Sequence, residues 1–248
     1  MILRNLRNSF LLASFLIVFT VQADELVKTS APKPKFATST VRLFQSQDYV
    51  RKHPAPDFWA LMPYYLPQQD GAACGIASMS MIINAARAHQ NLTASDALIT
   101  QKAFVEKMKI DYSHGIALDD LGTDVKKALI TYGLDPHSKS TVEVIHVDGS
   151  KAQAKKIRAL LIENEKSDHN FILANFLQSE FTGDPEGAVG HISPVAAFDA
   201  AKNKVLIMDV DREYYEPYWV SFDTFIKGMN TSDDSQKKTR GLVFIGIR

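Results

Sequence analysis

The sequence predicts an α+β protein, because helical spacing of apolar residues dominates its first half and short apolar strands dominate its second half. The chain has 248 residues, of which 46% are hydrophobic and 23% charged, a composition typical of a globular protein and not of a disordered or fibrous one. Its 28 basic residues balance 28 acidic residues, so no excess of positive charge would attract nucleic acid. A chain of this length can bury a full core.

Residues 1–23 have the pattern of a secretory signal peptide. Arg4 and Arg7 precede an apolar run over residues 10–21 that is too short for a comfortable membrane span, and Ala23 supplies a small residue at a cleavage position. We therefore expect an exported protein, periplasmic or secreted, with no stable membrane insertion after processing. An uncleaved anchor helix is the alternative.

Residues 24–56 are predicted to be an extended N-terminal segment, because Pro32 and Pro34 alternate with lysines in a pattern that favours an extended chain. The folded domain is then expected to cover residues 57–248.

Within that domain, apolar residues recur with either helical or strand spacing. Gly71 marks a loop before the first helix, and Gly133 ends the third. The predicted helices are 74–86, 95–109, 118–132, 150–164 and 221–229. The predicted strands are 142–147, 171–176, 191–198, 204–210 and 242–247.

The single cysteine of the chain, Cys74, is a candidate nucleophile. It cannot form an internal disulfide, and in an oxidising compartment a lone thiol is a liability unless it is buried or used in chemistry. Cys74 would begin the helix 74–86, where unpaired backbone N–H groups and the helix dipole favour a thiolate. Buried packing is the structural alternative.

His191 stands apart from the other histidines because it follows a glycine and opens an apolar strand. Asp209 ends the next apolar strand, where a carboxylate has no evident structural role. A hairpin through residues 200–203 would bring the two side chains together, so that the carboxylate could orient the imidazole. Gln68, on the loop before Cys74, could donate to an oxyanion. Taken singly, each of these could instead be a core histidine, a turn carboxylate or an ordinary loop glutamine.

Cys74, His191 and Asp209 are also metal-ligand types. However, the chain has no Cys-x-x-Cys and no paired histidines on a helix, so we expect no metal site from them.

Four ordered segments resemble motifs of the phytochelatin synthase family, and the similarity spans about residues 55–248. They are residues 58–68 (FWALMPYYLPQ) with Cys74-Gly75-Ile76-Ala77-Ser78 and Asn84-Ala85; Gly190-His191-Ile192-Ser193-Pro194; Leu206-Ile207-Met208-Asp209-Val210 with Arg212, Pro217 and Trp219; and Lys238-Thr239-Arg240-Gly241.

The resemblance implies a papain-like cysteine peptidase fold and an enzyme that acts on glutathione, γ-Glu-Cys-Gly. Cys74 would attack the Cys–Gly amide, glycine would leave, and the γ-Glu-Cys acyl group would pass to water or to a second glutathione, which yields phytochelatin. His191 would be the general acid, Asp209 would orient it, and Gln68 with the Cys74 backbone N–H would hold the oxyanion.

The resemblance further implies that Asp233 and Arg240 bind the γ-glutamyl end of the substrate, with Arg212 as a further candidate. No cofactor is expected to be obligatory; Cd²⁺ or Zn²⁺ would enter as the thiolate complex of the substrate. The chain ends at Arg248 without a Cys-rich extension, as in the short bacterial members, in which hydrolysis tends to outweigh polymerisation. An acidic insert at residues 178–189 could reshape the acceptor side of the cleft, so the sequence does not decide between water and glutathione as the acyl acceptor. It also does not decide whether the protein forms a homodimer.

Two other function classes stay open at this point. One is a general papain-like peptidase or isopeptidase, which would cleave ordinary peptides in preference to glutathione. The other is a non-catalytic thiol-binding or metal-binding protein with Cys74 as the ligand, which would never release glycine.

Overall fold

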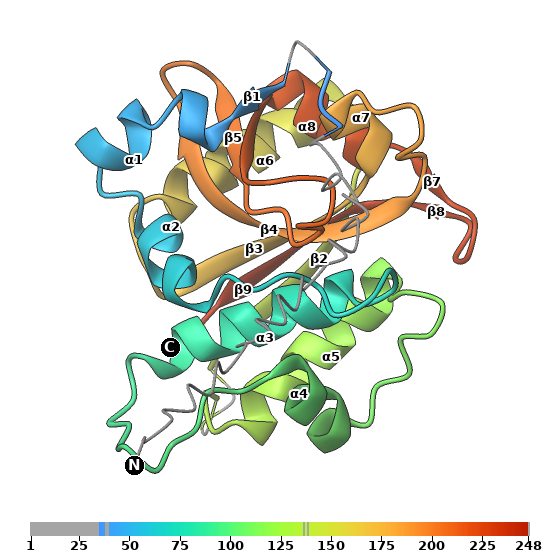
Figure 1. Ribbon diagram of the computed structural model, residues 1–248. Coiled ribbons are helices and arrows are strands. Elements are labelled where there is room, and N and C mark those ends of the chain that lie inside the picture. Colours follow the sequence, from blue (N-terminus) through green and yellow to red (C-terminus); the bar gives the residue numbers. More distant parts are fainter. Residues whose placement is uncertain (1–34, 38–39, 136, 138, 248) are drawn as a thin grey trace, which may run out of the picture. The chain divides into compact units, whose positions relative to one another are not determined.

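A seven-stranded sheet, antiparallel throughout, runs through the described part of the molecule (Figure 1). The computed structural model describes residues 35–37, 40–135, 137 and 139–247. The strands follow one another across the sheet in the order β1 (Val41–Arg42), β6 (Tyr218–Ser221), β5 (Lys204–Ile207), β4 (Gly190–Asp199), β3 (Asn170–Leu177), β9 (Gly241–Gly246) and β2 (Thr141–His146). A separate short hairpin joins β7 (Ser232–Asp233) and β8 (Lys238–Thr239).

Helices cover both faces of the sheet (Figure 1). On one face lie α2 (Pro56–Leu61), α3 (Cys74–Arg87), α4 (Gln101–Met108) and α5 (Leu118–Thr131); on the other lie α6 (Lys151–Asn164), α7 (Gln178–Thr182) and α8 (Phe222–Met229). The remaining helical segments are α1 (Asp48–Lys52), η1 (Leu43–Gln45) and η2 (Met62–Tyr64). The predicted α+β class is confirmed.

The central strands supply a separate hydrophobic core to each face. In β3, Phe171 and Leu173 belong to the cluster with α3, whereas Ile172, Ala174 and Phe176 belong to the cluster with α6, α7 and α8. Side chains alternate between the faces of a strand, so a strand that is apolar at every position must be covered twice. The apolar run over residues 171–174 of β3 therefore accounts for helices on both sides.

The described part of the predicted extended segment is folded instead. Val41 pairs with Trp219 at the edge of the sheet, Val50 on α1 is buried, and the indole of Trp219 donates to the carbonyl of Ser46 at 3.0 Å. The proline-rich composition that suggested an extended chain is confined to residues near 32–35, while apolar residues after position 40 reach the core. The predicted signal peptide and residues 24–34 lie outside the described residues.

One predicted helix begins later than expected. The helix predicted at 95–109 starts at Gln101, and Thr100 caps it by accepting a hydrogen bond from the backbone of Ala103 at 3.2 Å. Residues 93–96 are held in a turn, because the Asp96 carboxylate accepts from the backbone N–H of Thr93 at 2.7 Å. Short polar side chains that bond locally compete with the helix in this way. In the described part of the chain, no helix has the length and apolar character needed to cross a bilayer.

Candidate active site

Cys74 is the first residue of α3, a helix that is buried along almost its whole length. Its first turn lies close to the start of β4, because Gly75 has no side chain; a Cβ there would be 3.3 Å from the Cδ1 atom of Ile192. The hydroxyl of Ser78 donates to the carbonyl of Ile192 at 3.1 Å and ties the helix to the strand. The cysteine is therefore held next to the strand that carries His191.

His191 and Asp209 form a buried hydrogen-bonded pair. Nε2 of His191 lies 2.8 Å from Oδ1 of Asp209, and the two side chains are 4% and 0% exposed. The predicted hairpin between residues 191–198 and 204–209 is confirmed, since β4 and β5 pair antiparallel. With Nε2 turned to the carboxylate, the other ring nitrogen is left for the thiol.

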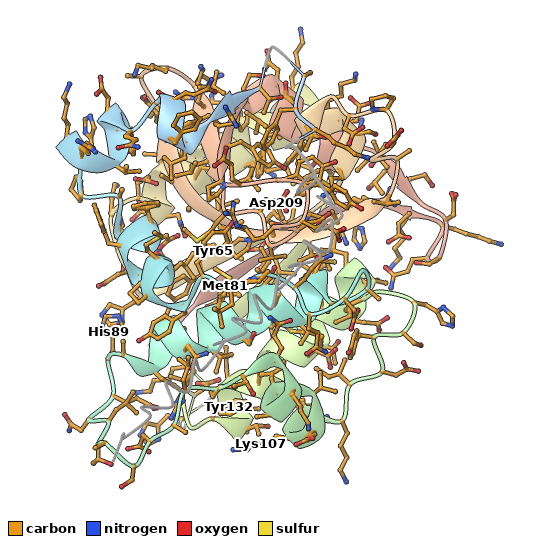
Figure 2. All side chains as sticks on the ribbon, viewed as in Figure 1. Tyr65, Met81, His89, Lys107, Tyr132 and Asp209 are labelled. Atoms are coloured by element: carbon orange, nitrogen blue, oxygen red, sulfur yellow. The ribbon has the colours of Figure 1, made fainter. Side chains whose placement is uncertain are left out.

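Asp209 is held by more than the histidine. The backbone N–H of Asp211 donates to Oδ1 at 2.9 Å, and the hydroxyl of Tyr218 donates to Oδ2 at 2.9 Å. The hydroxyl of Tyr65 donates to the backbone carbonyl of Asp209, and Figure 2 labels both residues. These partners fix the carboxylate, which in turn fixes the ring of His191.

Burial alone would lower the pKa of His191, but the charge of Asp209 and the hydrogen bonds to Asp209 and Cys74 outweigh it, so the pKa is raised well above its ordinary value. Burial raises the pKa of Asp209, but the positive charge of His191 and the hydrogen bonds to the carboxylate hold it below its ordinary value. Both shifts favour an imidazolium next to an ionised carboxylate.

A pocket of about 200 Å³ opens at Cys74 and also contains Asp233 and Arg240. Arg240 is held by its Nη1 atom, which donates to Thr231 at 3.2 Å, whereas its buried Nε atom has no hydrogen-bond partner among the described residues. Gly190 leaves room for this side chain, because a Cβ there would be 3.0 Å from Nη2 of Arg240. The pocket thus combines a thiol with an acid and a guanidinium that has a free donor.

Asn175 also lines this pocket, and the sequence analysis missed it. It is 4% exposed, and its Oδ1 atom has no partner among the described residues. A buried polar atom without a partner is costly unless a ligand or water satisfies it. The signal available in the sequence was an asparagine within the otherwise apolar run FILANF.

Gln68 and Arg212 lie outside the set of residues that line this pocket. The backbone N–H of Gln68 donates to the carbonyl of Val210 at 2.8 Å, so its loop is tied to the segment after Asp209. Its side-chain Oε1 is buried and has no partner in the part of the chain that the structure describes. Arg212 stacks on the ring of Tyr65, donates to the carbonyl of Tyr215 at 3.1 Å and lines a different groove. The structure thus brings Asp233 and Arg240 to Cys74, and places Arg212 elsewhere.

Known proteins of one family are similar to this chain over most of its length. The sequence profile of the phytochelatin synthase family matches residues 35–242. The chain is 27% identical over 224 residues to glutathione gamma-glutamylcysteinyltransferase 1 of Lotus japonicus, covering 87% of this chain and 41% of that protein. It is 24% identical over 231 residues to the protein of that name from Arabidopsis thaliana (89% and 44%) and 26% identical over 234 residues to that from Triticum aestivum (90% and 42%).

The chain therefore spans about two fifths of the length of these relatives. The family match covers most of the described residues, including Cys74, His191, Asp209 and the residues that line the pocket at Cys74. The chain belongs to the phytochelatin synthase family.

Proposed function

We propose that this protein is a glutathione γ-glutamylcysteinyl transferase and hydrolase with a papain-like arrangement, in which Cys74 at a helix start is the nucleophile. The observation that carries the proposal is the buried His191–Asp209 pair next to Cys74, at a pocket that also holds Asp233 and Arg240. Membership of the phytochelatin synthase family supports glutathione as the substrate.

In the first half-reaction, the Cys74 thiolate attacks the carbonyl carbon of the Cys–Gly amide. The imidazolium of His191 gives its proton to the amide nitrogen, the C–N bond breaks, and glycine leaves. A thioester then joins the γ-Glu-Cys acyl group to Cys74. Asp209 keeps the ring in place throughout and stabilises its positive charge whenever the ring is protonated.

In the second half-reaction, a water molecule or the α-amine of a second glutathione attacks the thioester. The neutral ring of His191 accepts the proton of the attacking group, and the C–S bond breaks to restore the Cys74 thiolate. Water gives γ-Glu-Cys, and glutathione gives a phytochelatin. Residues 178–189, which include α7, precede His191 and border the acceptor side in this proposal.

The γ-glutamyl end of the substrate carries an α-carboxylate and an α-ammonium group. We assign the carboxylate to the guanidinium of Arg240, whose Nε has no partner among the described residues. A guanidinium can bind a carboxylate through two parallel N–H groups. Asp233 would accept from the ammonium group, and Asn175 would supply its buried amide to the peptide portion. Arg212 lines another groove, and in this proposal it holds the Tyr65 ring in position by packing against it.

The oxyanion of the tetrahedral intermediate needs two donors, for which we propose the backbone N–H of Cys74 and the side-chain amide of Gln68. Cys74 opens a helix, so its N–H has no partner within α3. Removal of one such donor costs about 10²- to 10³-fold in rate. No cofactor takes part in these steps; Cd²⁺ or Zn²⁺ would enter bound to the thiolate of glutathione, as part of the substrate.

We also propose that the protein is exported to the periplasm or secreted. The support is the pattern of residues 1–23, which lie outside the described residues. Expression of the full chain with its leader in a bacterial host, followed by mass measurement of the periplasmic fraction, should give a chain that begins at Asp24. A chain of full mass in the membrane fraction would instead support the uncleaved anchor.

One experiment tests the proposed function. The protein is incubated with glutathione, with and without Cd²⁺, and the products are resolved by mass. We expect glycine together with γ-Glu-Cys or (γ-Glu-Cys)₂-Gly, and neither product from Cys74→Ala. Faster cleavage of unrelated peptides than of glutathione would favour a general peptidase, and no glycine release from folded wild-type protein would favour a thiol-binding protein.

A further inference from the structure

Two histidines and an aspartate gather in a second cluster, at the end of α3 opposite to Cys74 and beside the start of β3. His89 follows the end of α3, whose first residue is Cys74, and Asp168 and His169 directly precede β3. Figure 2 shows His89 at the end of α3, away from Asp209. A helix rises 1.5 Å per residue, so the 14 residues of α3 place the cluster about 20 Å from Cys74.

The three side chains lie close together. One ligand atom from each of His89, Asp168 and His169 can be chosen so that all three lie within 4.8 Å of one another. Nε2 of His89 is 3.7 Å from Oδ2 of Asp168, and Nε2 of His169 is 3.8 Å from Oδ1. The two imidazole rings are tilted by 31° with their centroids 4.2 Å apart.

These separations suit a shared ion better than direct hydrogen bonds. A hydrogen bond between nitrogen and oxygen needs about 2.7–3.2 Å, which both contacts exceed. Two atoms that bind one tetrahedral ion at about 2 Å each lie about 3.3 Å apart. Shifts of about half an ångström in these exposed side chains would bring both nitrogen–oxygen pairs to the spacing of two ligands on one ion.

The surroundings also suit a cation. The cluster lines a pocket of about 220 Å³, which leaves space for water as a further ligand, and no lysine or arginine is among the described residues that line it. His89 follows the C-terminal end of α3, and a helix C-terminus favours positive charge. Two neutral imidazoles and one carboxylate are ligands typical of zinc sites that keep an open position.

We propose that His89, Asp168 and His169 bind one divalent transition-metal ion of the Zn²⁺ type, with water in the remaining position. The ion would join the end of α3 to the start of β3. It would therefore stabilise the contact between the helical layer and the sheet, at a site separate from Cys74. This inference does not depend on the proposed function.

The test uses untagged Cys74→Ala protein, so that the active-site thiol cannot bind the metal. After treatment with a chelator and dialysis, the protein is titrated with Zn²⁺ in a calorimeter, and its melting temperature is measured with and without the metal. We expect one equivalent of Zn²⁺, and a rise in Tm of about 5–10 °C at a hundredfold excess over Kd. Mg²⁺, which prefers oxygen ligands, should give neither effect.

The variant His89→Ala/His169→Ala in the same background should bind Zn²⁺ at least about tenfold more weakly. The matched control is His137→Ala, which removes an exposed histidine elsewhere and should bind as the parent does. Co²⁺ bound to the parent should show the weak visible bands of nitrogen and oxygen ligands. Absence of Zn²⁺ uptake, or uptake that is unchanged in the double variant, would overturn the proposal, whatever the activity on glutathione.

Discussion

The active-site pair, His191 and Asp209, and the second cluster, which contains His89 and Asp168, use the same kinds of side chain in opposite surroundings. His191 and Asp209 are 4% and 0% exposed and lie 2.8 Å apart, whereas His89 and Asp168 are 36% and 48% exposed and lie 3.7 Å apart. A charge pair is worth roughly four times more at an effective dielectric constant of about 20 than in bulk water. Burial therefore couples one imidazole–carboxylate pair strongly, and exposure leaves the other pair free to adjust its position.

The difference also shows how one helix can carry two kinds of site. At its start, α3 presents N–H groups that favour a thiolate, and at its end it presents carbonyls that favour a cation. β3 runs beside this pair of sites, with Asn175 near one and His169 beside the other. The predictions that follow separate the two clusters experimentally.

The largest effect is expected at the buried cluster. His191→Gln removes the group that carries the proton, so glycine release from glutathione should fall by about 10⁴-fold or more. The same substitution at the exposed His137 should leave the rate unchanged. A His191→Gln enzyme that kept a tenth of the wild-type rate would show that the ring does not carry the proton.

A smaller loss is expected for Asp209→Asn, about 10²- to 10⁴-fold in kcat. The charge of Asp209 raises the pKa of His191, so the imidazolium of the wild type survives to higher pH. Without that charge, the alkaline limb of the activity profile should move to lower pH. Rates measured across the pH range check this.

The matched control for this shift is Asp119→Asn. Asp119 lies 3.0 Å from Nε2 of His146 and also pairs with Lys238 on β8, whose partner strand carries Asp233. Its loss can therefore change KM, but it leaves the His191–Asp209 pair intact and should leave the pH profile in place. An alkaline limb that does not move in Asp209→Asn would contradict the coupling between Asp209 and His191.

Substrate binding should respond next. Arg240→Lys loses the fork that fits a carboxylate, and KM for glutathione should rise roughly 10- to 100-fold with a smaller change in kcat. Arg51→Lys, on the exposed side of α1, is the control. Arg212→Lys should change KM less than Arg240→Lys does; the reverse order would assign the substrate carboxylate to Arg212.

The smallest effect is expected at the exposed cluster without metal. His89→Ala removes a side chain that has no hydrogen bond within the described residues, so Tm of metal-free protein should change by no more than about 2 °C. Thermal unfolding in the presence of a chelator measures it. A fall of many degrees would mean that the His89 side chain stabilises the fold by its own packing, and that the cluster contributes to stability without a metal ion.

Features that depend on one element, or on two elements joined by a short turn, could be predicted from the sequence. The helix that begins at Cys74, the pairing of β4 with β5, and the proximity of His191 to Asp209 follow from local apolar spacing and from a short turn. The edge strand β1 was missed, because two residues are too few to show alternation and pair with a strand far along the chain. Asn175 and Tyr218 were missed for a related reason, since the partners that define their roles come from other elements.

The sequence by itself determined the α+β class, the family motifs and the candidate thiol, imidazole and carboxylate, because these depend on residue type and on neighbours along the chain. Only the tertiary structure decided that Asp233 and Arg240 share a pocket with Cys74 and that Arg212 lies in another groove. It alone brought His89 to Asp168 and His169, some 80 residues later in the chain. Such contacts depend on how the helical layers pack on the sheet. Contacts between residues far apart in the chain produce no periodic pattern of apolar residues in the sequence.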